Sequence, residues 1–309
     1  MLLAVLVAML FAFGAAPDDV PAIEKQLAAG DYRAALASLE AIPKEQRGAR
    51  WSLLASKAYD GLNDPARAVE QAQRAIGLDP RSDGARLQLA QIFLSRNTPQ
   101  PAYEILHEAA PLFPRSALIR FGLGLALNGL QRYADAIPVL QECLRLKPDL
   151  AAAFDALGNA YLDSRSFDGL LRDAAAYQAL HPADFRGYYY EAVARQKLGR
   201  DAAQTEALAR RSLELNPRFA AAHALLGKLL LDAGRPKDAV SDLEQAVRLR
   251  PEYTPAHMYL ANAYKELGRM DDARREYAAV KRLKEQEDKP VPHLRYHRGN
   301  ESPAPVDRQ

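Results

Sequence analysis

Proline recurs along this chain at a nearly constant spacing. Pro80, Pro114, Pro148, Pro182, Pro217 and Pro251 are separated by steps of 34, 34, 34, 35 and 34 residues. Proline cannot donate a helical hydrogen bond, so each one predicts the end of one helix or the start of the next. A fixed period of this length indicates stacked helical hairpins, each of which contacts its neighbours along the chain.

Small residues mark the expected contact between the two helices of each hairpin. With each proline at the thirty-second position, the units begin at Ala16, Ala49, Asp83, Ala117, Ala151, Phe185, Ala220 and Thr254. The eighth position reads Ile23, Ser56, Ala90, Gly124, Gly158, Ala192, Gly227 and Ala261, and all of these residues except Ile23 are small. The twentieth position reads Ala35, Ala68, Ala102, Ala136, Leu170, Gln204 or Thr205, Ala239 and Ala273. A large side chain at either position would overpack the contact, at a cost of about 1–3 kcal/mol.

The fifteenth position predicts the turn inside each hairpin. Six of its eight residues are glycine or asparagine, which tolerate a left-handed backbone between two helices. The full set is Gly30, Asn63, Asn97, Gln131, Arg165, Gly199, Gly234 and Gly268.

One stretch of the chain carries a known motif. Residues 154–161 read Phe-Asp-Ala-Leu-Gly-Asn-Ala-Tyr and fit the pattern aromatic-x2-Leu-Gly-x2-Tyr. With the period, this motif resembles the tetratricopeptide repeat (TPR) family over roughly Asp18 to Lys289. The resemblance implies an all-α fold, a right-handed superhelical solenoid of about eight stacked antiparallel helical hairpins.

Three units depart from the pattern. Arg165 at the turn and Leu170 at the tight contact predict a splayed fifth hairpin. One extra residue between Gly199 and Pro217 predicts a shifted helix end or a bulge in the sixth hairpin. The first unit lacks the hallmark residues and a closing proline, so residues 17–48 are expected to form a capping repeat with a polar outer side.

Composition narrows the classes of partner and site. Forty-one Lys and Arg residues face 39 Asp and Glu residues, for a net charge of +2, which argues against a nucleic-acid surface. We also expect almost no strand. The single cysteine, Cys143, excludes an intramolecular disulfide and is expected to be a buried packing residue.

The chain starts with an apolar segment, MLLAVLVAMLFAFGAA, in which residues 1–16 carry no charge. It is shorter than the ~20 residues of a spanning helix and ends in small residues, so it reads as a secretory signal cleaved after Gly14 or Ala16, with Gly14 favoured because Pro17 follows Ala16. We therefore expect export, to the periplasm of a bacterium, although no Lys or Arg precedes the apolar run as it does in most secretory signals. Retention of residues 1–16 as an inner-membrane anchor is the alternative.

The repeat pattern fades towards the C-terminus. We expect the solenoid to occupy residues 49–287, with the last helix prolonged to about Asp288. Four prolines follow it in residues 288–309, which predicts a flexible tail.

The resemblance places the first helix of each hairpin on a concave face that binds extended peptides or partner helices. From the fifth unit onward this face mixes amides, charges and tyrosines, which suit a peptide backbone and interface anchoring. The predicted partner-binding groove comprises Asn159, Tyr189, Tyr190, Lys228, Met258, Tyr259, Asn262 and Lys265.

Two other interpretations of the concave face remain. A superhelical inner face can carry such residues simply because it is hydrated. The third and fourth units offer a more apolar surface, with Leu87, Leu94, Leu118, Phe121 and Leu125. Chaperone-tail binding is not predicted, because Asp155 or Met258 stands where the family's carboxylate clamp requires a lysine.

Catalysis has weak support in the sequence. His223 and His257 share the fourth position of adjacent units and could form a metal pair or a pH switch, but packing between hairpins is favoured. Asp155 and Asp163 lie eight residues apart, about 12 Å along a helix, and their spacing alone argues little for catalysis. The sequence contains no HExxH, Gly-x-Ser-x-Gly or phosphate-loop motif.

These patterns predict a non-catalytic protein–protein interaction scaffold without a cofactor or a metal. Its partner is expected to be a protein or peptide, not a nucleic acid. Membrane contact is expected only through residues 1–16 if they are retained, in which case the chain would be a tethered assembly factor of the cell envelope.

Overall fold

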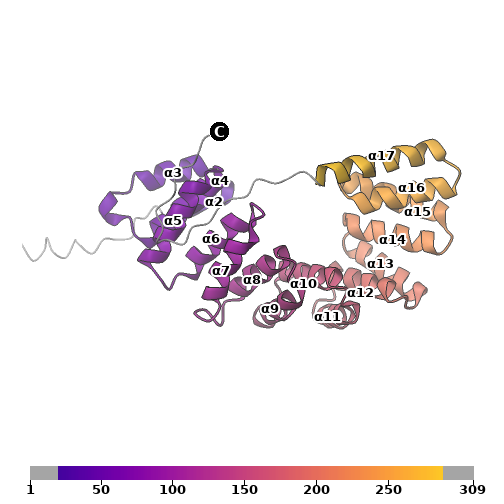
Figure 1. The fold of residues 1–309 in the computed structure, drawn as a ribbon, viewed down its shortest axis with the longest axis horizontal. Helices are drawn as coiled ribbons and strands as arrows, with labels where there is room; N and C mark the ends of the chain where they lie inside the picture. Colours follow the sequence, from indigo (N-terminus) through magenta and orange to yellow (C-terminus); the bar gives the residue numbers. More distant parts are fainter. Residues whose placement is uncertain (1–19, 288–309) are drawn as a thin grey trace, which may run out of the picture. The chain divides into compact units, whose positions relative to one another are not determined.

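A computed structural model describes residues 20–287, and every regular element in this range is helical (Figure 1). The range contains sixteen α-helices, one short 3-10 helix and no strand, as the repeat pattern predicts. The apolar N-terminal segment and the proline-rich C-terminal segment, predicted as signal or anchor and as tail, lie outside the described residues.

The helices pair in chain order into eight hairpins. The first four are α2 (Val20–Ala29) with α3 (Tyr32–Glu40), α4 (Ala49–Gly61) with α5 (Pro65–Leu78), α6 (Asp83–Leu94) with α7 (Pro99–Ala109), and α8 (Ala117–Gly129) with α9 (Tyr133–Leu146). The other four are α10 (Ala151–Asp163) with α11 (Phe167–Leu180), α12 (Phe185–Lys197) with α13 (Ala202–Leu215), α14 (Ala220–Asp232) with α15 (Pro236–Leu249), and α16 (Thr254–Glu266) with α17 (Met270–Glu287). The 3-10 helix η1 (Lys44–Gln46) follows α3. From α4 onward, each hairpin begins at the residue predicted from the proline spacing.

All eight turns inside the hairpins share one geometry. Each residue at the predicted fifteenth position has a positive φ, between 54° and 81°. The next backbone N–H donates to the carbonyl five residues earlier, which is the bond of a Schellman motif. The fifth turn also follows this geometry: Arg165 has φ 57°, and the N–H of Ser166 donates to the Tyr161 carbonyl at 2.9 Å. The splay predicted between the two helices of this hairpin stays a prediction.

The predicted tight positions lie in the interior. All eight residues of the eighth position and the assigned residues of the twentieth position are buried, including Leu170, which is 0% exposed. In the second hairpin the two positions touch directly, because Ser56 Oγ donates to the Ala68 carbonyl at 2.7 Å. In the sixth hairpin the buried member is Thr205, at 1% exposure, whereas Gln204 is exposed.

The extra residue of the sixth unit lengthens its turn. Helix α13 begins three residues after the left-handed Gly199, whereas α15 begins two residues after Gly234. Asp201 occupies the added position and accepts a hydrogen bond from the N–H of Gln204 at 3.1 Å, so it caps α13. The predicted shift of a helix end is confirmed, and both helices of this hairpin remain continuous.

The described residues divide at Ala156, inside α10, into two compact units that each contain several hairpins. The first unit ends at Ala156, and the second unit begins at Leu157. Within each unit, consecutive helices pack together, and the first helix of a hairpin also contacts the first helix of the next. In the first unit these contacts join α2, α4, α6 and α8; in the second they join α12, α14 and α16. The first helices therefore form a continuous layer within each unit, and this layer carries the candidate sites.

The one cysteine is a core residue, as predicted. Cys143 is 0% exposed, and its Sγ lies 3.2 Å from the Ala117 carbonyl oxygen. Burial raises the pKa of the Cys143 thiol to about 11. Across residues 20–287, no helix combines the length and the apolar character that a membrane crossing requires.

Candidate interaction surface

Four of the predicted groove residues meet in one open cavity of the second unit. The cavity has a volume of about 350 Å³ and lies between α14 and α16. It is lined by Lys228, Leu231, Asp232, Tyr259, Asn262, Lys265 and Glu266. The four predicted members are Lys228, Tyr259, Asn262 and Lys265, from two successive first helices. We refer to this site as the α14–α16 cavity.

Lys228 is held in place within the α14–α16 cavity. Its Nζ donates to Asp232 Oδ2 at 2.7 Å, one helical turn further along α14. The same ammonium lies 5.9 Å from the centroid of the Tyr259 ring, within the range of a cation–π interaction. Tyr259 in turn packs against a small cluster of buried alanines, Ala224, Ala246 and Ala256. The Tyr259 ring, which forms the aromatic wall of the cavity, is thus held in position by packing against the core.

The side-chain amide of Asn262 is oriented by a residue that the sequence analysis missed. Tyr277 on α17 donates its hydroxyl to Asn262 Oδ1 at 2.7 Å. Because Oδ1 of Asn262 already accepts this hydrogen bond within the protein, the Nδ2 hydrogens remain as donors for a ligand. Tyr277 lies on the second helix of its hairpin, whereas the predicted groove residues all lie on first helices.

The remaining predicted groove residues lie outside the α14–α16 cavity. Tyr189 on α12 is partly buried. The centroid of its ring lies 5.1 Å from the centroid of the Tyr190 ring and 4.8 Å from that of the Phe219 ring. Asn159 is exposed on α10, and Met258 is partly exposed on α16. None of these three lines the cavity.

The assignment of Tyr190 to the groove is wrong. Tyr190 is only 5% exposed. A Cβ atom at Gly158 would lie 2.3 Å from its ring, so the ring fills the space that the glycine leaves open. Tyr190 is therefore a packing residue between α10 and α12, and it is inaccessible to a partner.

The two histidines act within their own hairpins. His223 Nδ1 lies 2.8 Å from Asp242 Oδ1, and its Nε2 lies 3.0 Å from the Pro217 carbonyl oxygen. His257 repeats this arrangement with Glu276 at 2.6 Å and the Pro251 carbonyl at 2.9 Å. Each ring thus fastens a first helix to its second helix and to the preceding loop. Residues 20–287 contain no group of three or more His, Cys, Asp or Glu side chains placed to hold a metal ion.

The surroundings of His223 raise the pKa of its imidazole. Burial lowers its pKa, but the hydrogen bonds to Asp242 and the Pro217 carbonyl outweigh burial and raise the pKa above its usual value. Both ring nitrogens face oxygen acceptors, so only the imidazolium can donate to both.

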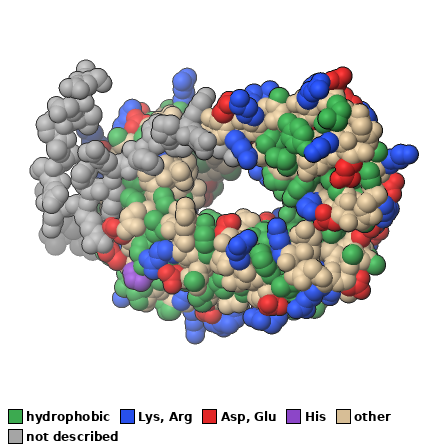
Figure 2. Space-filling view, turned by 45° about the vertical axis from the view of Figure 1, so that its right-hand side comes forward, with side chains coloured by type: hydrophobic (Ala, Val, Ile, Leu, Met, Phe, Trp, Pro, Cys, Tyr) green, Lys and Arg blue, Asp and Glu red, His purple; other side chains and the backbone are tan. Residues whose placement is uncertain are grey.

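The apolar residues predicted on the third and fourth hairpins also share a cavity. Leu87, Leu94, Leu118, Phe121 and Leu125 line a depression of about 420 Å³ between α6 and α8 in the first unit. On the face shown in Figure 2, basic and acidic side chains are interspersed.

The packing of consecutive hairpins, with first helices stacked on first helices, defines a helical-repeat solenoid. Family models described as tetratricopeptide repeat match residues 53–106, 100–151 and 230–290. The chain belongs to the tetratricopeptide repeat family.

Several solved structures share this fold. A tetratricopeptide repeat protein from Parabacteroides merdae aligns with a TM-score of 0.62 and 13% identity, over 76% of this chain and 93% of that one. Pseudomonas aeruginosa pilF aligns with a TM-score of 0.51 and 18% identity, over 78% and 97%. A chain of the Cut9-Hcn1 hetero-tetramer of the APC/C aligns with a TM-score of 0.55 and 13% identity, over 81% of this chain and 49% of that one.

One curated relative matches half of the chain. Superkiller complex protein 3 of Mus musculus is 27% identical over 150 residues, which is 48% of this chain. The match covers 10% of the mouse protein's length. The likeness thus concerns about half of this chain and a small part of a much longer protein.

Proposed function

We propose that this chain is a non-catalytic scaffold that binds protein segments on its layer of first helices, with the α14–α16 cavity as the binding site of the second unit. Membership of the tetratricopeptide repeat family supports a protein–protein interaction scaffold. The observation that carries the finer proposal is the convergence of Lys228, Tyr259, Asn262 and Lys265 in one open cavity.

The chemistry of this cavity suits a peptide. The Asn262 amide can donate to a backbone carbonyl, and the Tyr259 ring offers a large contact surface with little rotamer entropy to lose. Lys265 is exposed, and no carboxylate of residues 20–287 lies within ion-pairing distance of it. It can therefore pair with an acidic group of the partner. Because the cavity is already formed, binding requires little ordering of the protein.

The proposed location is the bacterial cell envelope, and residues 1–16 support it through their uncharged, apolar sequence and small C-terminal residues. The alternative is a membrane-tethered assembly factor that retains this segment. Mass spectrometry of the N-terminal peptide distinguishes the two: a start at Ala15 supports release, and an intact Met1 supports tethering.

The binding proposal is tested by affinity capture from an envelope fraction, followed by titration of the captured protein against purified variants. Tyr259→Ala combined with Lys265→Ala removes the ring and the available ammonium from the cavity. The matched control is Lys237→Ala, an exposed lysine on α15 in the same unit. We expect the double variant to bind at least tenfold more weakly and the control to bind normally. Equal affinities for all three proteins would place the binding surface elsewhere.

A further inference from the structure

A second candidate surface lies in the first unit, on residues that the proposed α14–α16 cavity does not use. Its apolar part is the 420 Å³ depression between α6 and α8, which we call the apolar cavity. Leu118, on its wall, remains 48% exposed. Leucine and phenylalanine side chains from two successive first helices thus line one concave surface that is open to solvent.

A larger polar cavity adjoins the apolar one. It has a volume of about 720 Å³, and its lining includes Glu24 and Leu27 of α2, Lys57 and Asp60 of α4, and Gln88 of α6. Lys57 and Gln88 line both cavities. The two therefore form one trough that crosses α2, α4, α6 and α8, and Lys57 stands at its junction. We call this surface the N-terminal trough.

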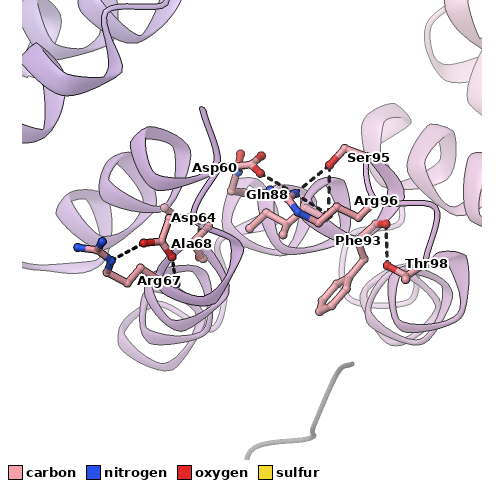
Figure 3. Close-up of polar contacts among 11 residues, drawn as sticks. Asp60, Asp64, Arg67, Ala68, Gln88, Phe93, Ser95, Arg96 and Thr98 are labelled. Carbon is pink, nitrogen blue, oxygen red and sulfur yellow. Dashed lines mark hydrogen bonds and ion pairs between the residues drawn. The ribbon is translucent and has the colours of Figure 1, made fainter. Parts of the chain in front are cut away.

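Most charges of the N-terminal trough neutralise each other. Figure 3 shows Arg96 extending to Asp60, with Nη1 to Oδ1 at 2.8 Å, and Gln88 Nε2 lies 3.4 Å from Asp60 Oδ2. These side chains of Arg96 and Asp60 are only 17% and 20% exposed, so the pair is a fixed part of the wall. Glu24 is paired with Arg50 at 2.7 Å.

Lys57 is the exception in the trough. It is exposed, and within residues 20–287 no carboxylate lies within ion-pairing distance of its ammonium. The junction of the apolar and polar cavities therefore carries one uncompensated positive charge. A ligand that fills the apolar cavity and extends towards α4 meets this charge next, and an acidic group is the complementary one.

We propose that the N-terminal trough binds a segment of a second protein that places two or three apolar side chains in the apolar cavity and an Asp or Glu side chain on Lys57. Gln88 and Gln91, which line the apolar cavity, supply amide donors and acceptors for the backbone of this segment. The inference rests on the proposed function, that first helices bind protein segments, but it assigns a separate site and a defined partner chemistry.

The chain's own residues 1–16 are a rival occupant, since they are apolar. They contain no acidic residue, so they would leave Lys57 without a partner. A peptide of residues 1–16 is accordingly one arm of the test.

The test uses an array of short synthetic peptides in which three leucines run through every spacing and are followed by two glutamates. Counterpart peptides replace the glutamates with lysines or the leucines with serines. The best leucine–glutamate peptide is then labelled with fluorescein and titrated by anisotropy against the full chain. The variants are Lys57→Glu and Leu118→Ser. The matched control is Leu112→Ser, because Leu112 is also exposed, at 61%, but lies outside the trough.

We expect Lys57→Glu to weaken the glutamate peptide about fivefold and to strengthen its lysine counterpart, as reversal of one exposed ion pair would do. Leu118→Ser should weaken both peptides about tenfold, because it removes an apolar contact that binding buries. Leu112→Ser and the Tyr259→Ala/Lys265→Ala variant should bind as the wild type does. Circular dichroism melting curves confirm that each variant is folded.

Three results would overturn the assignment. They are failure of every leucine–glutamate peptide to bind, affinity that ignores Lys57→Glu and Leu118→Ser, and stronger binding of the 1–16 peptide than of any acidic one. Loss of binding in the Tyr259→Ala/Lys265→Ala variant would move the site to the second unit. Because the two surfaces share no residue, failure here leaves the α14–α16 cavity untouched, and the reverse also holds.

Discussion

The contact between Gly227 and Leu243 gives a quantitative test of the repeat register. A Cβ atom at Gly227 would lie 2.4 Å from Leu243 Cγ and 2.5 Å from its Cδ2. Non-bonded carbon atoms prefer separations of about 3.5–4.0 Å, so Gly227→Ala forces a shift of roughly 1 Å. Leu243 is 0% exposed and is enclosed by the core of the second unit, so it cannot move into solvent.

The magnitude follows from two opposing terms. Overpacking a filled core costs about 1–3 kcal/mol. Replacing a helical glycine by alanine returns about 0.5–1 kcal/mol, because the unfolded chain loses entropy. We therefore expect Gly227→Ala to lower the free energy of unfolding by about 1 kcal/mol, and by no more than about 2.5 kcal/mol. Gly227→Leu should cost more and unfold the seventh hairpin locally.

Gly77 supplies the matched control for the same substitution. It is an exposed helical glycine near the end of α5, and a Cβ atom there would meet no atom within 4 Å. Gly77→Ala should raise the free energy of unfolding by a few tenths to about 1 kcal/mol. Lys237→Leu, on the exposed surface of α15, should have almost no effect.

The assay is urea unfolding followed by far-UV circular dichroism, with a double-mutant cycle. Gly227→Ala/Leu243→Ala vacates the space that the new methyl group needs, so its loss should be smaller than the sum of the two single losses. If Gly227→Ala stabilises the protein as Gly77→Ala does, or if the two changes at Gly227 and Leu243 simply add, the proposed contact is absent and the register is wrong.

Three further outcomes are expected. Because the pKa of His223 is raised in the folded state, its contribution to stability is complete below the unfolded value of about 6.5 and is lost as the pH rises through the folded pKa; His223→Gln should remove this part of the pH dependence of urea unfolding. The buried Cys143, whose pKa is about 11, should resist alkylation by iodoacetamide in the native protein and react in denaturant, and equal rates in both would contradict its burial. Arg165→Gly should raise the unfolding free energy by about 0.5–1 kcal/mol, since glycine carries no penalty at φ 57°, and a lower melting temperature would count against the left-handed turn.

Sequence reasoning predicted the hairpins well because their determinants are local and repeated. A proline and a small residue recur at fixed positions, and each has one structural meaning at that position. The register is therefore set several times over, and the first residues of seven consecutive first helices could be predicted individually. The ambiguous twentieth position of the sixth unit depended on where one extra residue lies, and the structure resolves it in favour of Thr205.

The candidate sites were less predictable because they depend on contacts between helices and hairpins within each compact unit. Tyr190 occupies a position expected to face the groove, but Gly158 on α10 leaves room for its ring, and the ring packs there. Tyr277 orients Asn262 from a second helix, outside the first-helix positions that the repeat pattern places on the groove. The unpaired charge of Lys57 is recognised only from the structure, in which Arg96 of the next hairpin forms an ion pair with Asp60.

The central claim is that first helices bind protein partners, and hydrogen–deuterium exchange of the full chain with and without its captured partner tests it most directly. The account predicts slower exchange in first helices, either α4, α6 and α8 around the N-terminal trough or α14 and α16 around the α14–α16 cavity. Second helices should exchange as in the free protein. Protection confined to second helices such as α5, α7 and α15 would contradict the account.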